Sequence, residues 1–137
     1  MVDIPLSFSG QVIHGEGRGR ELGFPTANIA VEDDGRGMLP RGVFAATVQH
    51  QEDEESFAIV NIGTRPTFGE IDLVVELHLF DFTGDLYGQR LNFTLIKKIR
   101  DERAFAHKEA LKEQINHDIH HARLLFAQQE KDYTQHP

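Results

Sequence analysis

The sequence predicts a mainly β domain, a small closed antiparallel barrel with a long α-helix packed on it near the C-terminal end. Up to about residue 100, short segments alternate apolar and polar residues, which is the period of a strand. From about 108 to 129, apolar residues recur at helical spacing, and no proline- or serine-rich linker separates the two zones. We therefore expect one domain over residues 1–137, with the barrel over about 5–100.

Five strand-like segments are visible between turn residues, four of them alternating and the one at 56–62 almost wholly apolar, as a central strand can be, and there is room for a sixth strand beside residues 26–31. The segments are 6–12, 42–50, 56–62, 75–80 and 91–95. A series of short strands in a chain of 137 residues is expected to close into a barrel, because closure removes the exposed sheet edges.

The predicted helix carries one apolar stripe that should pack across the barrel. The stripe consists of Leu111, Ile115, Ile119, Ala122 and Phe126. His107 stands where a serine or aspartate N-cap is usual, so no capping residue fixes the start of the helix.

Composition excludes several classes of protein. The formal net charge of −8 argues against a nucleic-acid partner or an anionic membrane surface, and no apolar run is long enough to cross a bilayer. The absence of cysteine excludes disulfides, thiolate zinc sites and cysteine nucleophiles. It also suits a reducing compartment, so we expect a cytoplasmic protein, and nothing in the sequence demands more than a monomer.

Residues 15–28 form a glycine-rich segment that ends in Pro-Thr-Ala-Asn. Glycines let backbone amides approach a ligand closely, and successive amides in such a turn can bind an anion. Arg18 or Arg20 could add a charged contact to a phosphate, while Thr26 and Asn28 offer neutral oxygens that suit Mg²⁺. The spacing is neither that of a Walker A loop nor that of a dinucleotide or kinase glycine motif. Glycine content alone fits a flexible hairpin connection equally well.

A series of motifs in the same order resembles the ATP-dependent riboflavin kinase family, over residues 5 to about 126. The motifs are GQVIHG at 10–15, GRGR at 17–20, LGFPTAN at 22–28, NIGTRPTF at 61–68, ELHLFDF at 76–82, DLYG at 85–88 and IRDERAF at 99–105. This resemblance implies a six-stranded antiparallel barrel with a long C-terminal helix. It also implies transfer of the γ-phosphoryl group of ATP to the ribityl 5′-hydroxyl of riboflavin, giving FMN and ADP.

The resemblance also implies roles for particular residues. On the nucleotide side it implies that Thr26 and Asn28 bind Mg²⁺ and phosphate. It also implies that Gly15 and Arg20 belong to the loop over the nucleotide. Zn²⁺ and Mn²⁺ are the alternatives to Mg²⁺. The remaining nucleotide contacts are Leu79, Asp81 and Tyr87, the catalytic residue is Glu76, and the flavin-side residues are Arg100, Arg103 and Phe105.

Residue chemistry alone leaves two of these roles open. Strand periodicity puts Glu76 on the face opposite the Val75 and Leu77 stripe, where it is either a general base for the hydroxyl or an ordinary solvated carboxylate. Phe105 and the neighbouring arginines suit a flat flavin ring, but Phe105 could equally anchor the start of the helix to the barrel.

Other interpretations rank below the kinase. A non-catalytic flavin- or nucleotide-binding sensor is the main alternative, and an oligonucleotide-binding barrel is disfavoured by the negative charge and the absence of tryptophan. His117 and His121 have metal-ligand spacing but point away from the apolar stripe, with His120 beside them, so we expect surface histidines. No His-x-Gly-His motif occurs, so we expect no adenylyltransferase domain and no onward conversion of FMN to FAD.

Overall fold

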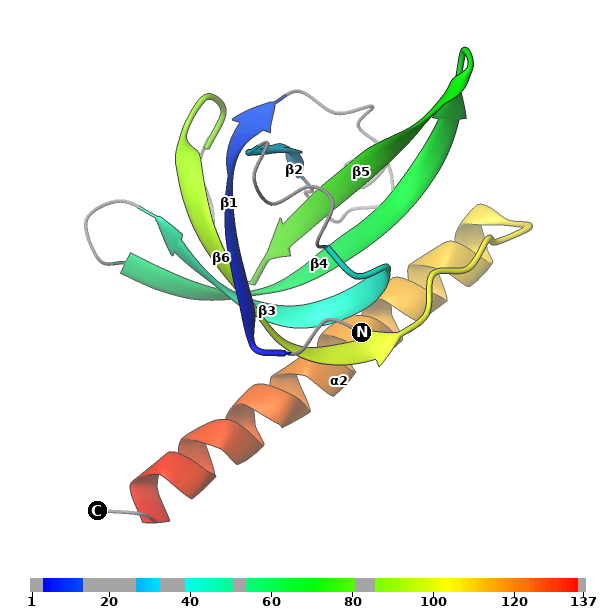
Figure 1. Cartoon of the computed structure of the whole chain (residues 1–137). Helices are drawn as coiled ribbons and strands as arrows, with labels where there is room; N and C mark the ends of the chain where they lie inside the picture. The colour runs from blue at the N-terminus through cyan, green and yellow to red at the C-terminus, as the bar shows by residue number, and fades with distance from the viewer. Residues whose placement is uncertain (1–3, 14–26, 33–38, 51–53, 81–85, 136–137) are drawn as a thin grey trace.

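The computed structural model describes residues 4–13, 27–32, 39–50, 54–80 and 86–135. Over these residues the chain forms a closed barrel of six antiparallel strands with one long helix against its outer wall (Figure 1). The elements are β1 (Leu6–Ile13), β2 (Ala27–Val31), β3 (Gly42–His50), β4 (Glu54–Thr67), β5 (Glu70–Leu79), β6 (Arg90–Arg100) and α2 (Lys108–Gln135). Around the barrel the order is β1-β2-β5-β4-β3-β6, and β6 closes on β1. The predicted fold class is confirmed.

The barrel interior is filled by the apolar side chains that the alternation predicted. Phe44, Ala46 and Val48 of β3 are fully buried, as are Leu91 and Phe93 of β6. A closed sheet of six strands leaves room inside only for its own side chains, so this interior is a packed core. The functional groups must therefore lie on the outer wall or in the loops.

Several elements are longer than predicted, including β5 and β6, and two of them, β4 and α2, show why. β4 continues past residue 62 to Thr67, because its second half pairs with the start of β5 in a hairpin, from Gly63 opposite Val74 to Thr67 opposite Glu70. Glycine and proline in this stretch are typical of a loop, but cross-strand pairing outweighs that preference. The helix begins at Lys108 as expected and runs to Gln135 rather than 129. Its last turns are polar and lack the apolar stripe that set the predicted end.

The helix lies across the outer face of β3, β4 and β6 through a second apolar cluster. Ile59 on the barrel wall and Ala122 and Phe126 on the helix are buried in it. The ring of Phe126 stacks on Phe57 of β4 with centroids 4.1 Å apart. The second half of the predicted stripe, Ile119, Ala122 and Phe126, thus packs against the barrel in this cluster.

A buried ion pair fixes the helix to the end of β6. Arg100 donates from Nε and Nη2 to the carboxylate of Asp118 at 2.9–3.1 Å, and Gln114 Nε2 donates to the same carboxylate at 2.9 Å. The side chain of Asp118 is only 4% exposed and that of Arg100 18%. Such a pair holds position well, because either charge left alone would lack both water and a partner.

Replacing Asp118 with alanine should lower the free energy of unfolding by about 3 kcal/mol, since it leaves Arg100 partly buried and uncompensated. Urea denaturation followed by circular dichroism measures this loss. Asp101→Ala is the matched control, because Asp101 pairs with Lys98 at the surface, where an ion pair contributes little. Equal effects of the two substitutions would contradict the anchoring role of Asp118.

Candidate functional site

One register row on the outer wall of the barrel brings together three of the predicted site residues. Asn28 of β2 lies opposite Glu76 of β5, which lies opposite Asn61 of β4. The row continues from Asn61 to Val43 of β3 and from Val43 to Arg100 at the end of β6. Neighbouring strands lie about 4.8 Å apart, so Glu76 is one strand away from each asparagine. The row is named below by its residues, Asn28–Glu76–Asn61–Val43–Arg100.

The side chains of this row point away from the barrel interior. Val75 and Leu77, which flank Glu76, are 1% and 2% exposed and belong to the interior cluster. Since successive side chains in a strand point to opposite faces, Glu76 lies on the outside, where it is half-buried. Asn28 lies on the same face, because its neighbour Ile29 is buried in the interior. The partial burial of Glu76 distinguishes it from a freely solvated strand carboxylate.

The nucleotide-side residues are only partly described. Ile13, the last residue of β1, pairs with Asn28, so the chain enters and leaves residues 14–26 beside the row. Gly15, Arg20, Thr26 and Asp81 lie outside the described residues, and their roles stay predictions.

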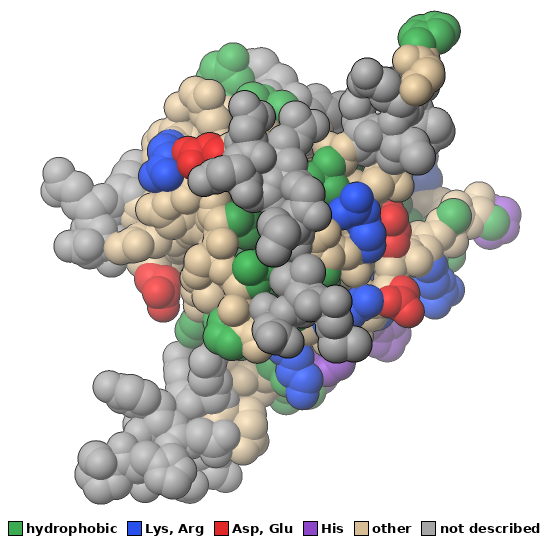
Figure 2. All heavy atoms as spheres, viewed as in Figure 1, with side chains coloured by type: hydrophobic (Ala, Val, Ile, Leu, Met, Phe, Trp, Pro, Cys, Tyr) green, Lys and Arg blue, Asp and Glu red, His purple; other side chains and the backbone are tan. Residues whose placement is uncertain are grey.

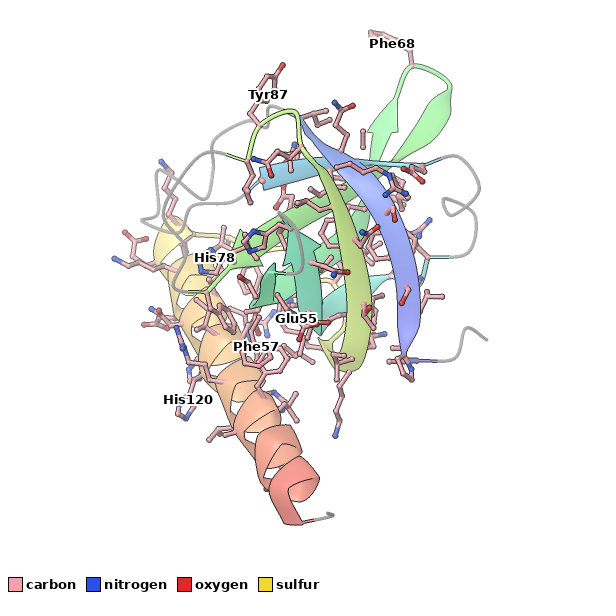
Figure 3. All side chains as sticks on the ribbon, turned by 90° about the vertical axis from the view of Figure 1, so that its left-hand side faces the viewer. Glu55, Phe57, Phe68, His78, Tyr87 and His120 are labelled. Carbon is pink, nitrogen blue, oxygen red and sulfur yellow. The ribbon has the colours of Figure 1, made fainter. Side chains whose placement is uncertain are left out.

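Tyr87 and Leu79 differ in their surroundings. Tyr87 is 54% exposed in the turn before β6 (Figure 3). The next residue, Gly88, has a φ of +83° and donates its N–H to the carbonyl of Val12 at 2.9 Å. This bond holds the turn of Tyr87 beside the end of β1 that leads to the glycine-rich segment. Leu79 packs against the interior cluster instead, so its side chain is not part of the outer row.

The predicted flavin segment is built around one aromatic ring. The guanidinium of Arg103 lies over the ring of Phe105 at 4.8 Å, and that of Arg100 lies 5.6 Å from the same centroid. Arg100 is largely committed, because it holds Asp118 and also donates from Nη1 to the carbonyl of Asp101 at 3.1 Å. Arg103 is exposed and Phe105 half-buried. The segment thus presents Arg103 and part of Phe105 outward, while Arg100 holds the helix.

This segment folds back onto the outer wall beside the row. The carboxylate of Glu102 occupies the space that a Cβ at Gly63 would take, so a side chain there would displace it. Gly63 lies two residues beyond Asn61 on the same face of β4. The segment after β6 therefore lies beside Asn61, whereas Ile13, the last described residue before the glycine-rich segment, lies beside Asn28.

Asn61 is a residue of the row that could contact a ligand on sequence grounds but is explained there equally well as the end of a strand. It resembles a strand-end residue in the sequence, but β4 extends to Thr67 and places it in the middle of the strand. Its Oδ1 is buried, and within the described part of the chain no group donates a hydrogen bond to it. Only the strand pairing with β5 brings it beside Glu76, so the local sequence carried no signal of its position.

The three helix histidines, His117, His120 and His121, are exposed on α2, and Figure 3 labels His120. Among the described residues, no group of three His, Cys, Asp or Glu side chains is placed to hold a metal ion. Beside Glu76, the amide of Asn28 supplies a neutral oxygen of the kind that suits hard cations.

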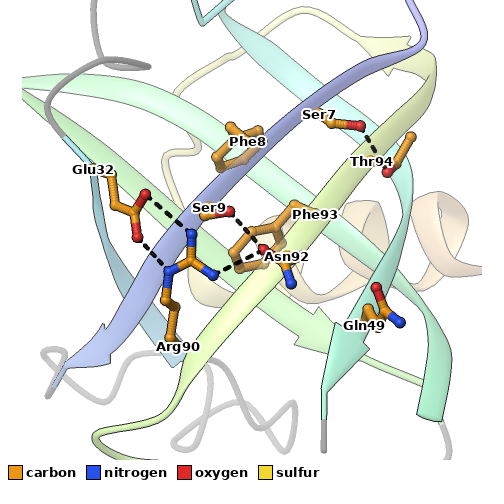
Figure 4. A pocket seen from close by; sticks show the side chains of 9 residues that line it. All are labelled: Ser7, Phe8, Ser9, Glu32, Gln49, Arg90, Asn92, Phe93 and Thr94. Atoms are coloured by element: carbon orange, nitrogen blue, oxygen red, sulfur yellow. Dashed lines mark hydrogen bonds and ion pairs between the residues drawn. The ribbon is translucent and has the colours of Figure 1, made fainter. Parts of the chain in front are cut away.

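A separate groove of about 540 Å³ lies on the outer face of β1 and β6 (Figure 4). Its polar groups bond to one another: Ser9 Oγ donates to Asn92 Oδ1 at 2.6 Å, and Arg90 pairs with Glu32. The Arg90 hydrogen bond lowers the pKa of Glu32. On the face shown in Figure 2, described acidic and basic side chains likewise lie side by side. None of the described site residues lines this groove.

Comparisons with known proteins show the family to which this chain belongs. The family model described as Flavokinase, riboflavin kinase, matches residues 2–126. The bifunctional riboflavin kinase/FMN adenylyltransferase of Escherichia coli (strain K12) is 42% identical over 123 residues, which are 89% of this chain and 38% of that protein. The chain thus spans about two fifths of the length of the curated relatives it matches.

Two solved structures share the fold. The riboflavin kinase of Trypanosoma brucei superposes with a TM-score of 0.66 at 26% identity, covering 95% of this chain and 85% of that chain. A structure from Streptococcus pneumoniae described as a macrolide-efflux protein gives a TM-score of 0.79 at 32% identity, covering 87% of this chain and 38% of that chain. Among the described helices of the present chain, none is both long and apolar enough to span a membrane. The family match over nearly the whole chain, on a barrel of the same architecture, shows that this chain belongs to the riboflavin kinase family.

Proposed function

We propose that this domain is a riboflavin kinase that transfers the γ-phosphoryl group of ATP to the 5′-hydroxyl of riboflavin. A bond forms between the 5′-oxygen and the γ-phosphorus, the bond from that phosphorus to the β–γ bridging oxygen breaks, and FMN and ADP leave. The observation that carries the proposal is the pairing of Asn28 with Glu76 on the outer wall of a barrel of this family. Family membership also favours the kinase over a non-catalytic sensor.

Glu76 is the general base in this proposal. Its carboxylate accepts the proton of the 5′-hydroxyl as the oxygen attacks phosphorus, a role worth about 10²–10⁴-fold in rate. Phosphoryl transfer otherwise depends on positioning and on neutralised charge at the phosphates. A single carboxylate that accepts the proton is therefore sufficient acid–base catalysis. The fixed strand pairing keeps Glu76 next to the phosphate-side residue Asn28.

A divalent cation fits the residues on the phosphate side. Asn28 and Thr26 provide neutral oxygen donors, a set that suits Mg²⁺ and leaves further positions for phosphate oxygens and water. When bound, the ion supplies positive charge at the phosphates, which this chain of net charge −8 lacks. Mg²⁺ is our proposal over Zn²⁺ and Mn²⁺.

On the flavin side, Arg103 and Phe105 are the groups that the structure presents outward. A guanidinium donates to ring carbonyls, and a phenyl face stacks on a flat heteroaromatic ring. Arg100 acts here as the anchor of the segment, since its donors hold Asp118 and the Asp101 carbonyl. We also propose that the domain acts as a cytoplasmic monomer, on the sequence arguments given above.

The proposed activity is tested by incubating the protein with riboflavin, ATP and Mg²⁺ and separating the flavins by chromatography. We expect a peak of FMN that grows with time and requires both ATP and the metal. Binding of riboflavin without any FMN would favour the sensor, and FAD as a product would contradict the assignment of a kinase alone.

Glu76→Gln should lower kcat by about two to four orders of magnitude with little change in nucleotide affinity, because glutamine keeps the shape but cannot take the proton. Steady-state kinetics and nucleotide titration measure the two quantities. Glu55→Gln is the matched control, an exposed carboxylate in β4, and should have normal turnover. Near-normal kcat in Glu76→Gln would remove Glu76 from the role of base.

Thr26→Ala should weaken the binding of Mg²⁺–nucleotide, because it removes one of the two proposed oxygen ligands. Isothermal titration with a non-hydrolysable ATP analogue, with and without Mg²⁺, separates metal-dependent from metal-independent affinity. Thr94→Ala, in the groove on β1 and β6, serves as the control. Unchanged affinity in Thr26→Ala would place the metal elsewhere.

A further inference from the structure

Asn61 carries an unmet hydrogen-bond acceptor at the centre of the site. Its Oδ1 is buried, and no described residue donates to it. Buried acceptors in folded proteins nearly always have a donor, so a missing one beside a catalytic group points to a donor that arrives with a ligand. The partner of Asn61 in the register is Glu76, the proposed base.

The order of residues along the row gives the site a direction. Asn28, on one side of Glu76, is the proposed ligand for the metal and phosphates, and the chain there leads to the glycine-rich segment. Asn61 lies on the other side of Glu76, where the segment with Arg103 and Phe105 folds back and Glu102 rests on Gly63. Since the attacked phosphorus lies toward Asn28, the rest of the hydroxyl-bearing substrate must extend toward Asn61.

Because Asn61 Oδ1 is a hydrogen-bond acceptor, the group of the ligand that contacts it must be a donor. Phosphate oxygens of a metal-bound nucleotide are themselves acceptors and cannot satisfy Oδ1. A hydroxyl group can, because its O–H donates while its oxygen remains free for other partners. Riboflavin carries such hydroxyls on the chain between its ring and its 5′-oxygen, and one strand spacing of about 4.8 Å is within the length of that chain.

We propose that Asn61 Oδ1 accepts a hydrogen bond from a secondary hydroxyl of the ribityl chain and thereby orients the 5′-hydroxyl toward Glu76. Asn61 is then a substrate-binding residue that distinguishes flavins with a polyol chain from flavins without one. The inference rests on the proposed function, since it takes riboflavin as the substrate of this site.

The test compares the binding of riboflavin and lumiflavin, which has the same ring but a methyl group in place of the polyol chain. Fluorescence titrations are made with Mg²⁺ and a non-hydrolysable ATP analogue present, on the wild-type protein and Asn61→Leu. We expect Asn61→Leu to lose about tenfold in riboflavin affinity and nothing in lumiflavin affinity, as for one neutral hydrogen bond. Asn61→Asp, which keeps an acceptor oxygen, should retain most of the riboflavin affinity.

Asn92→Leu is the matched control on the outer wall. Asn92 Oδ1 already accepts from Ser9 and Arg90, so this substitution should lower the melting temperature and leave both flavin affinities unchanged. Asn61→Leu should show the reverse, with an unchanged or raised melting temperature, because it removes a buried acceptor that has no donor. If leucine prevents folding, Asn61→Ala makes the same comparison.

Three outcomes for Asn61→Leu would overturn the inference. They are unchanged riboflavin affinity, equal losses of affinity for riboflavin and lumiflavin, or a loss confined to the affinity for Mg²⁺–nucleotide, measured by isothermal titration. The last would assign the acceptor to a metal-bound water. Because the readout is binding, it is independent of turnover. A wild-type protein that binds riboflavin better than lumiflavin but makes no FMN would refute the proposed kinase and still decide the role of Asn61. Failure to bind either flavin would overturn both.

Discussion

The register of hydrogen bonding between each pair of neighbouring strands is the constraint on which the site of this domain depends. The residues of the row Asn28–Glu76–Asn61–Val43–Arg100 come from five strands and are far apart in the sequence. A slip of one residue in any of these strand pairings would turn a polar side chain into the packed interior and bring an apolar one outside. The burial of Val75 and Leu77 therefore specifies the outward position of Glu76 as strictly as any contact of Glu76 itself.

The helix extends this constraint to the end of the barrel. Arg100 closes the row and is held by Asp118, a residue of α2, while the rings of Phe57 and Phe126 pack the helix onto the wall. The segment between β6 and α2 is thus tied at both ends, and it carries Arg103 and Phe105. A segment with two fixed ends, such as this one that is proposed to bind the flavin, can present side chains in a defined place with little ordering cost on binding.

Sequence patterns predicted the architecture well because burial in a barrel follows the period of a strand. The alternation puts Phe44, Ala46 and Val48 on one face of their strand, and that face is the interior; the second half of the helical stripe, ending at Phe126, packs on the barrel. Pairing between distant strands has no local signature, so the position of Asn61 beside Glu76 could not be predicted.

The site was foreseen less completely than the fold. The resemblance predicts Arg100 on the flavin side, but no pattern in the sequence indicates that its donors bind Asp118 on the helix. Such pairs join residues that are far apart in the sequence and come together only in the folded structure. The end of α2 was missed for a different reason: the helix continues to Gln135, past the last residue of the apolar stripe in the sequence.

The closing pair of strands has a consequence for how the chain is made. β1, near the N-terminus, completes the barrel only by pairing with β6, from Leu6 opposite Leu95 to Gln11 opposite Arg90. During synthesis on the ribosome, β1 therefore emerges long before its last partner, and the nascent chain holds open edges and unburied apolar residues until β6 has followed. This barrel is thus a unit that forms after translation has passed its final strand, and the nascent chain is most exposed to aggregation and proteolysis in that interval.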